Sequence, residues 1–195
     1  MTAPAHSALY LSVPFCRSKC SFCNFASGVF SRQQFDGYVA HLEHAMAAAE
    51  SWVQASGAEF SPMLDSIYLG GGTPSVLAPD QLERLFKAAA RSFRIQPKAE
   101  VTVEVAPGTL SPEILDVLVR CGVNRVSLGV QSFVDEESRA VGRLHTRATT
   151  LDDIARLRAA GITEISVDLI AGLPHQSAES WSRSLDCLLY TSRCV

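Results

Sequence analysis

The chain has 195 residues, of which 47% are hydrophobic and 19% charged, and its formal net charge is −3. This composition is typical of one globular unit with enough apolar material for a core, and it excludes disordered and fibrous proteins. Seventeen basic residues against twenty acidic ones give no basic patch for a nucleic acid or an anionic membrane, so we expect neither partner.

From the first residues given, we expect no targeting signal. Residues 1–7 have neither the basic start nor the apolar stretch of a signal peptide, and no apolar run approaches the roughly 20 residues that span a bilayer. The predicted location is therefore the cytoplasm, where cysteines are expected to be reduced thiols or metal ligands. Three of the six cysteines, Cys16, Cys20 and Cys23, lie close together.

Strand and helix patterns alternate along the chain. Stretches rich in β-branched and aromatic residues predict strands at 10–13, 66–69, 101–105, 125–130 and 164–169. Between them, residues 81–93 place Leu82, Leu85, Phe86, Ala89 and Phe93 on one helical face. A further helix begins after Ser111, with Pro112 at its first position, and ends near Gly122. Crossovers of this length imply parallel strands, in a barrel-type or a doubly wound α/β arrangement.

The sequence contains an internal repeat of one βα unit. Residues 121–130 resemble residues 160–169: each stretch has a helix end, a glycine and a strand. Five βα units are predicted in total. After the fifth strand only one more helical pattern follows, at 179–185, so this strand is expected to have no parallel neighbour on its outer side.

Residues 187–195 resemble translated read-through of a transposon end used in sequencing libraries. We therefore expect a core domain over residues 1–186 and a non-native tail over 187–195, in which Cys187 and Cys194 are artefacts. Re-amplifying the locus from source DNA tests this interpretation.

The cysteine cluster has the spacing C-x3-C-x2-C, in a loop directly after the first predicted strand. Three thiolates so close together suit a soft metal centre, and three ligands on an iron–sulfur cubane would leave one iron open for a substrate or cofactor. The alternative is a zinc site with His41 or His44 as the fourth ligand. A disulfide would leave one of the three cysteines unpaired in a reducing compartment.

Other candidate residues follow the remaining strands. The segment Gly70-Gly-Gly-Thr-Pro-Ser75 follows the second strand and lets the backbone approach a ligand and point N–H groups at it. Glu104 ends the third strand, Gln131 follows the fourth and Asp168 ends the fifth. Each has a plain alternative interpretation as a turn or solvated residue. In parallel βα folds, however, these strand ends share one edge, where ligands collect.

The segment from Tyr10 to Phe25, with its C-x3-C-x-F-C loop, resembles the cluster loop of radical S-adenosylmethionine (SAM) proteins. The resemblance runs from about residue 7 to residue 186 and implies the partial (βα)6 TIM-type barrel of that superfamily, of which five units are present here. It further implies that Cys16, Cys20 and Cys23 hold a [4Fe-4S] cluster whose fourth iron is chelated by SAM.

The resemblance also implies the residues that contact SAM. The segments GGGTP, E-x-x-P-G-T, S-x-G-V-Q-S-F, G-R-x-H and D-L-I-x-G-L-P each match a family pattern. The expected contacts are Tyr10, Phe22, Gly71, Gly72, Thr73, Glu104, Gln131, Arg143 and Asp168. His145 and His175 are expected to be solvated loop residues rather than haem ligands, and Cys121 a structural thiol.

Within the superfamily, the resemblance is to the branch that contains oxygen-independent coproporphyrinogen III dehydrogenases (HemN type) and haem chaperones (HemW type). HemN-type loops carry a fourth cysteine where this chain has Phe25, and they follow a longer segment than the fifteen residues before Cys16. These features favour the chaperone, with haem and a recipient haemoprotein as partners. The dehydrogenase alternative implies a porphyrinogen substrate and an electron donor.

The sixth strand and C-terminal region of family members are missing, so this chain is expected to be a fragment that is poorly stable alone. The expected result of a thermal scan is a broad transition from a partly associated sample. A single cooperative transition from a monodisperse monomer would contradict this prediction.

Overall fold

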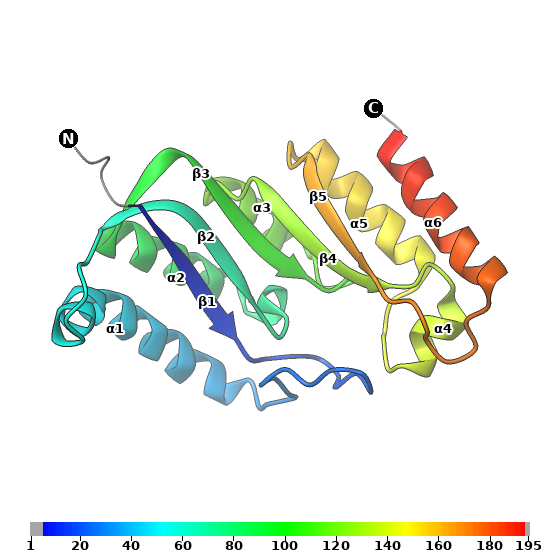
Figure 1. Cartoon of the computed structure of the whole chain (residues 1–195), viewed down its shortest axis with the longest axis horizontal. Coiled ribbons are helices and arrows are strands. Elements are labelled where there is room, and N and C mark those ends of the chain that lie inside the picture. Colours follow the sequence, from blue (N-terminus) through cyan, green and yellow to red (C-terminus); the bar gives the residue numbers. More distant parts are fainter. Residues whose placement is uncertain (1–5, 194–195) are drawn as a thin grey trace.

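A computed structural model describes residues 6–193 of the chain, with side chains as far as residue 189. Five strands alternate with helices (Figure 1). The strands are β1 (Ser7–Val13), β2 (Met63–Gly71), β3 (Arg94–Val105), β4 (Arg125–Gln131) and β5 (Glu164–Leu169). The helices are α1 (Gln33–Ala55), α2 (Pro79–Ser92), α3 (Pro112–Arg120), α4 (Asp135–Ala140), α5 (Arg147–Ala159) and α6 (Ala178–Arg193), with a short 3-10 turn, η1 (Pro74–Val76).

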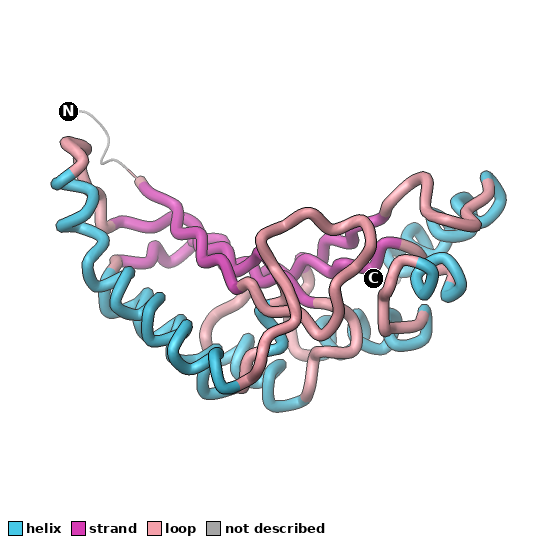
Figure 2. Tube along the Cα trace, turned by 90° about the horizontal axis from the view of Figure 1, so that it is seen from below, coloured by secondary structure: helices cyan, strands magenta, loops and turns pink. Residues whose placement is uncertain are grey.

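The sheet is parallel throughout and its strand order is β1-β2-β3-β4-β5. The order follows the sequence and never reverses, which distinguishes the barrel-type arrangement from the doubly wound one. The helices cover one side of the curved sheet and leave its concave side open (Figure 2). The predicted fold class, part of a TIM-type barrel with five βα units, is therefore confirmed, and within the described residues β5 pairs with β4 alone.

The core lies between the convex face of the sheet and the helices. Alternate strand residues point toward it, so Leu11 and Val13 of β1 are buried while Tyr10 and Ser12 are exposed on the concave face. The predicted apolar face of α2 is confirmed, with Leu82 and Leu85 fully buried. Burial of these side chains gives each βα unit its attachment to the sheet.

The repeated unit predicted from the sequence is also present. In both copies a glycine in the left-handed region ends a helix, Gly122 at φ +76° after α3 and Gly161 at φ +89° after α5. The next residue in each copy, Val123 or Ile162, donates its N–H to a carbonyl five residues back at 3.0 Å. Only glycine adopts this conformation without strain, so it closes the helix and aims the chain into the next strand.

Several predicted boundaries need correction. β1 and β2 each begin three residues earlier than predicted. β3 begins at Arg94 rather than residue 101, because residues 94–95 pair with the start of β2 and the register then shifts before Glu100. Pro97 lies inside this irregular stretch, and it cannot donate a ladder hydrogen bond, which hides the strand from its sequence pattern. The last helix is longer than predicted, since α6 continues to Arg193.

The predicted tail at 187–195 therefore begins within α6, where Cys187 is buried against the core. Cys194 lies outside the described residues. Whether the tail is native stays a prediction. Of the described residues, none belongs to a helix that is both long and apolar enough to cross a membrane.

Ser111 caps α3, as predicted, because its Oγ accepts a hydrogen bond from the N–H of Ile114 at 3.3 Å. Replacing Ser111 with Ala leaves that N–H without a partner and should lower the free energy of unfolding by about 1 kcal/mol. Urea denaturation measures the change. Ser111→Asp, which keeps a capping oxygen, and Ser51→Ala on the exposed side of α1 serve as controls. Equal stability of Ser111→Ala and wild type would contradict the capping role.

Candidate functional site

The loops that leave the carboxyl ends of the five strands meet at one edge of the sheet, around an open cavity of about 430 Å³. All but one of the residues predicted to form the site line this cavity. They are Cys16, Cys20, Phe22, Cys23, Gly71, Gly72, Thr73, Glu104, Gln131, Arg143 and Asp168. The structure thus brings these residues together, whereas their contact with a ligand stays a prediction.

The cysteine loop follows β1 and is closed by backbone hydrogen bonds. The N–H of Cys16 donates to Gly28 O at 2.9 Å, and the N–H of Gly28 donates to Pro14 O at 2.9 Å. Within the loop, Lys19 Nζ donates to the carbonyl oxygens of Phe25 at 2.9 Å and Ser27 at 2.8 Å. The ammonium group therefore holds together the two sides of the loop that carries the three thiols.

Two anchors fix this loop to the rest of the fold. Phe15 is buried and stacks on Phe35 of α1, with 4.0 Å between ring centroids. On the other side, Ser18 Oγ donates to Gly142 O at 2.9 Å, and the N–H of Ser21 donates to Val141 O at 3.2 Å, just after α4. The cysteines are therefore presented by a braced loop rather than a free one.

Each of the three thiols is reduced and has its own donor. Thr73 Oγ1 lies 3.8 Å from Cys16 Sγ, Arg143 Nη1 3.6 Å from Cys20 Sγ, and Lys19 Nζ 3.9 Å from Cys23 Sγ. Two of these donors are the cationic groups of Arg143 and Lys19, so Cys20 and Cys23 face positive charge. Thiolates are the ligands that iron–sulfur clusters require.

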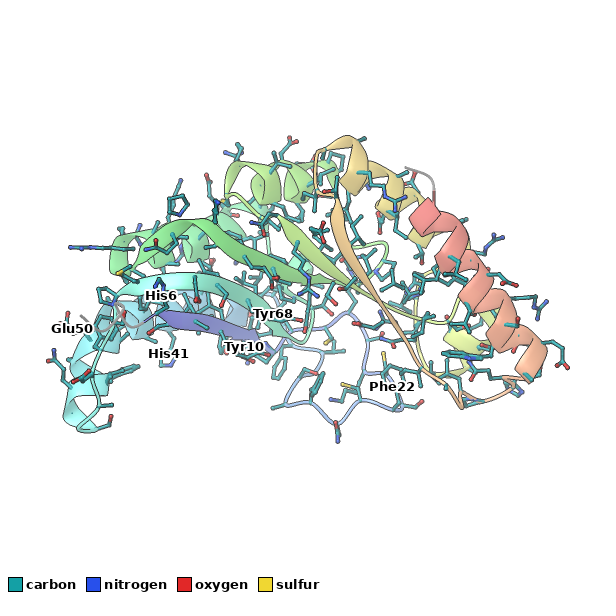
Figure 3. All side chains as sticks on the ribbon, turned by 45° about the horizontal axis from the view of Figure 1, so that its top comes forward. His6, Tyr10, Phe22, His41, Glu50 and Tyr68 are labelled. Carbon is teal, nitrogen blue, oxygen red and sulfur yellow. The ribbon has the colours of Figure 1, made fainter. Side chains whose placement is uncertain are left out.

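The thiols surround a cavity rather than a single point. Among residues 6–193, no three His, Cys, Asp or Glu side chains gather as ligands of one metal ion. A tetrahedral zinc ion requires four ligand atoms at about 2.0–2.3 Å from one centre, whereas a cubane takes each thiolate on a different iron. His41 and His44 lie on α1 and do not line the cavity, and His41 is far from the cysteine loop in Figure 3. Three thiols at the cavity, without His41 or His44 beside them, therefore match the donor set of the cluster better than that of the zinc alternative.

The glycine segment packs against the loop after β1. A Cβ on Gly72 would lie 2.8 Å from both Val13 O and Phe15 O, so no larger residue fits there. The N–H of Gly72 donates to Val13 O, and that of Thr73 donates to Phe15 O, each at 2.8 Å. We expected these N–H groups to point at a ligand, and that expectation is wrong because other parts of the protein already accept their hydrogen bonds.

Glu104 is half-buried at the end of β3 and has a partner for each oxygen. Tyr68 donates its O–H to Oε1 at 2.8 Å, and Gly71 donates its N–H to Oε2 at 3.0 Å. Burial raises the pKa of Glu104, and the nearby Asp168 carboxylate raises it further, while the two hydrogen bonds oppose both effects. Asp168 itself accepts from Ser127 Oγ at 3.3 Å. This side of the cavity thus presents two carboxylates as hydrogen-bond acceptors.

Gln131 and Arg143 close the cavity from the β4 side. Gln131 has φ +71°, at the point where the register between β4 and β5 shifts. A non-glycine residue in this region costs energy, and such strain is concentrated at ligand sites. Arg143 donates to Gly129 O, while its buried Nε has no hydrogen-bond partner among the described residues. An unpaired buried N–H at this position fits a polar or anionic ligand.

Tyr10 is the predicted site residue that does not line the cavity. Its side chain is 59% exposed on the concave face of the sheet and stacks on Tyr68, with 5.7 Å between ring centroids (Figure 3). Phe22, by contrast, lies on the cysteine loop and faces the cavity. Tyr10 therefore lies next to the site, where its ring contacts that of Tyr68.

Sequence reasoning missed Lys19 and Tyr68 and misjudged His145. Lys19 could have been found from its position inside the cysteine motif, and Tyr68 from its alternation with Gly70 on β2. His145 was expected to be solvated but is 8% exposed, with its Nε2–H donating to Val130 O at 3.1 Å. Burial, followed by the charge of Arg143, lowers the pKa of His145 to about 4.

Comparison with known proteins matches a model of the Radical SAM superfamily to residues 10–188. The chain is 39% identical over 173 residues to "Heme chaperone HemW" of Lactococcus lactis, covering 89% of this chain and 43% of that protein. It is 36% identical over 181 residues to "Oxygen-independent coproporphyrinogen III oxidase" of Bradyrhizobium diazoefficiens, covering 92% and 39% respectively. The solved HemN structure from Escherichia coli matches with a TM-score of 0.85 and 31% identity, over 95% of this chain and 42% of that one. The chain thus spans less than half the length of these relatives.

The low pKa of His145 predicts that the protein loses stability on acidification. His145 binds a proton near pH 6.5 in the unfolded chain and only near pH 4 in the folded chain. The contribution of the neutral, buried His145 to the free energy of unfolding is therefore complete above pH 6.5 and shrinks as the pH falls toward 4. Between pH 7.5 and pH 5, the free energy of unfolding of the wild type should fall by about 2 kcal/mol more than that of His145→Gln. Urea denaturation at both pH values gives this difference. The exposed His175, replaced by Gln, is the control, and the same pH dependence in both variants would disprove the assignment.

Proposed function

Because this chain belongs to the Radical SAM superfamily, we propose that its cavity holds a [4Fe-4S] cluster and SAM and that the protein is a haem chaperone of the HemW type. The superfamily implies the cluster and SAM. The observation that carries the chaperone proposal is Phe25, which stands where HemN-type loops have a fourth cysteine.

Phe25 is part of the site rather than a distant substitution. Its side chain lines the cavity and is 65% exposed, and its carbonyl oxygen accepts the hydrogen bond from Lys19. The loop therefore keeps the backbone arrangement around the three thiols while an apolar ring occupies this position. An exposed aromatic ring cannot ligate a metal as a cysteine does, but it suits contact with a flat apolar ligand such as haem.

The residues of this chain have separate proposed tasks. Cys16, Cys20 and Cys23 would hold the cluster, which together with SAM supplies one-electron chemistry when bound. Thr73, Lys19 and Arg143 each place a hydrogen-bond donor beside one of these sulfur atoms. Gln131 and the carboxylates of Glu104 and Asp168 face the same cavity and supply hydrogen-bond acceptors for SAM. Phe22 adds an apolar wall.

The finer parts of the function extend beyond the matched region. Haem as the bound ligand, a haemoprotein as its recipient and an electron donor as a further partner come from the class of relatives named haem chaperones, and the cytoplasmic location stays a prediction. The chain covers 43% of the Lactococcus relative, so these are proposals for the whole protein. They share one requirement, which is an intact cluster loop.

The alternative is an oxygen-independent coproporphyrinogen III dehydrogenase. The similarity to the Bradyrhizobium protein and to the Escherichia coli HemN structure favours it. In that case a hydrogen atom would be abstracted from a propionate side chain of the porphyrinogen. The resulting substrate radical would lose carbon dioxide and pass one electron to a separate electron acceptor, which leaves a vinyl group. The same cavity would serve, with the substrate rather than haem beside SAM.

The test is anaerobic iron–sulfur reconstitution of the protein expressed from the whole source gene. One sample is assayed for SAM cleavage with coproporphyrinogen III, and a second is titrated with haem. Bound haem and a loaded cluster without decarboxylation support the chaperone proposal, whereas vinyl product establishes the dehydrogenase. Zinc in place of iron, without SAM binding, would overturn both.

A matched pair of cysteine variants tests the ligand set. Cys20→Ser should lose most of its iron and its SAM binding, because Cys20 lines the cavity beside Arg143. Cys121→Ser should keep both, because this half-buried thiol packs against the core away from the cavity. Iron content and the visible absorption of the cluster give the result, and full iron loading of Cys20→Ser would contradict the assignment.

A further inference from the structure

Tyr68 lies beside the site without belonging to it. It stands on β2 with its side chain on the concave face, where its O–H donates to Glu104 Oε1 at 2.8 Å. Its ring does not line the cavity. Its hydrogen bond to the cavity-lining residue Glu104 is therefore a direct link between Tyr68 and the site.

The two oxygens of Glu104 are held in different ways. Oε2 accepts from the N–H of Gly71, whose position is set by the backbone at φ +104°. Within the part of the chain that the structure describes, Oε1 accepts a hydrogen bond from Tyr68 alone. With both bonds in place the carboxylate plane is fixed, and without Tyr68 it can rotate about the remaining bond. The Tyr68 hydroxyl is thus what selects one orientation.

The packing around Tyr68 preserves this pair. Tyr10 stacks on the Tyr68 ring at 5.7 Å with an interplanar angle of 23° (Figure 3). A Cβ on Gly70 would lie 2.7 Å from Tyr68 Cε1 and 2.8 Å from Glu104 Oε1. A side chain at position 70 would therefore push the two partners apart. Because Gly70 has no side chain, Tyr68 and Glu104 can approach closely enough for their hydrogen bond.

We propose that Tyr68 is a positioning residue for SAM binding: its hydroxyl fixes the orientation in which the Glu104 carboxylate faces the cavity, and Tyr10 contributes by stacking on Tyr68. This inference rests on the proposed function, since that function makes Glu104 a ligand of SAM. It also gives Tyr10 a role that agrees with its place outside the cavity.

The charge state of Glu104 supplies a readout, the pH dependence of SAM affinity, that would not change if Tyr68 had a purely structural role. An ionised carboxylate only accepts hydrogen bonds, so SAM binding through Glu104 weakens when the carboxylate takes up a proton. The hydrogen bond from Tyr68 lowers the pKa of Glu104 against the raising effect of burial and of Asp168. Removing the hydroxyl should therefore shift the acid loss of SAM affinity to higher pH.

The experiment compares Tyr68→Phe with Tyr38→Phe in the reconstituted whole protein. Both variants lose one hydroxyl that donates a 2.8 Å hydrogen bond, but Tyr38 donates to Ser12 O from α1 and contacts neither Glu104 nor the cavity. Equilibrium dialysis of labelled SAM gives the affinity between pH 5.5 and 8.5, and iron content confirms equal loading.

We expect Tyr68→Phe to bind SAM about tenfold more weakly at pH 7.5, as for loss of a hydrogen bond to a charged group. Its affinity should also fall off at a higher pH than that of wild type, while Tyr38→Phe follows the wild type. Equal affinity and equal pH profiles in the two variants would overturn the proposal.

A double-mutant cycle separates failure of this inference from failure of the proposed function. The unfolding of wild type, Tyr68→Phe, Glu104→Gln and the double variant is measured without SAM. A non-additive effect of about fivefold in the unfolding equilibrium constant is expected, because the two groups share a charge-assisted bond. If the loaded wild type binds no SAM, the proposed function fails, yet coupling would still show that Tyr68 positions Glu104. Additive effects would overturn the inference whatever SAM does.

Discussion

The backbone contact between Gly72 and the chain leaving β1 is the constraint on which the rest of the site depends. Two adjacent N–H groups, those of Gly72 and Thr73, donate to carbonyl oxygens on either side of Pro14. Because a Cβ at position 72 would overlap both carbonyls, the two loops can meet only at this glycine. The contact sets where the cysteine loop begins, which in turn places its three thiols opposite the ends of β3, β4 and β5.

The cavity carries charges of both signs. Lys19 and Arg143 stand beside cysteine sulfurs, and the Asp168 carboxylate lies close enough to Glu104 to raise the pKa of Glu104 further than burial does. A ligand with both anionic and cationic groups suits such a cavity better than a singly charged one does. An α-amino acid group attached to a cationic centre has that character, in agreement with the proposed cofactor.

Local signals were predictable from the sequence and long-range partners were not. The cap at Ser111 and the left-handed Gly122 follow from neighbouring residues alone, so the sequence contains all that determines them. The partners of the glycine N–H groups and of Tyr68 come from other strands, and no short pattern encodes them. The location of the site was predictable for a different reason. The carboxyl ends of parallel strands all lie at one edge of the sheet, whichever side chains form the core. The burial of His145 was not predictable either, because its ring bonds to Val130 O of β4, fifteen residues earlier in the chain.

The two copies of the helix, glycine and strand junction have a consequence for how this fold tolerates change. Both junctions lie at the amino ends of the strands, and each joins its helix to the next strand through a glycine and one buried apolar residue. These two connections contain no spare residues, so an inserted residue would rotate every later strand. The opposite edge carries the longer connections, whose length does not set the strand angle. New loops, and with them new ligands, are therefore accommodated more readily at the cavity edge than at these two junctions, while the sheet keeps the same curvature.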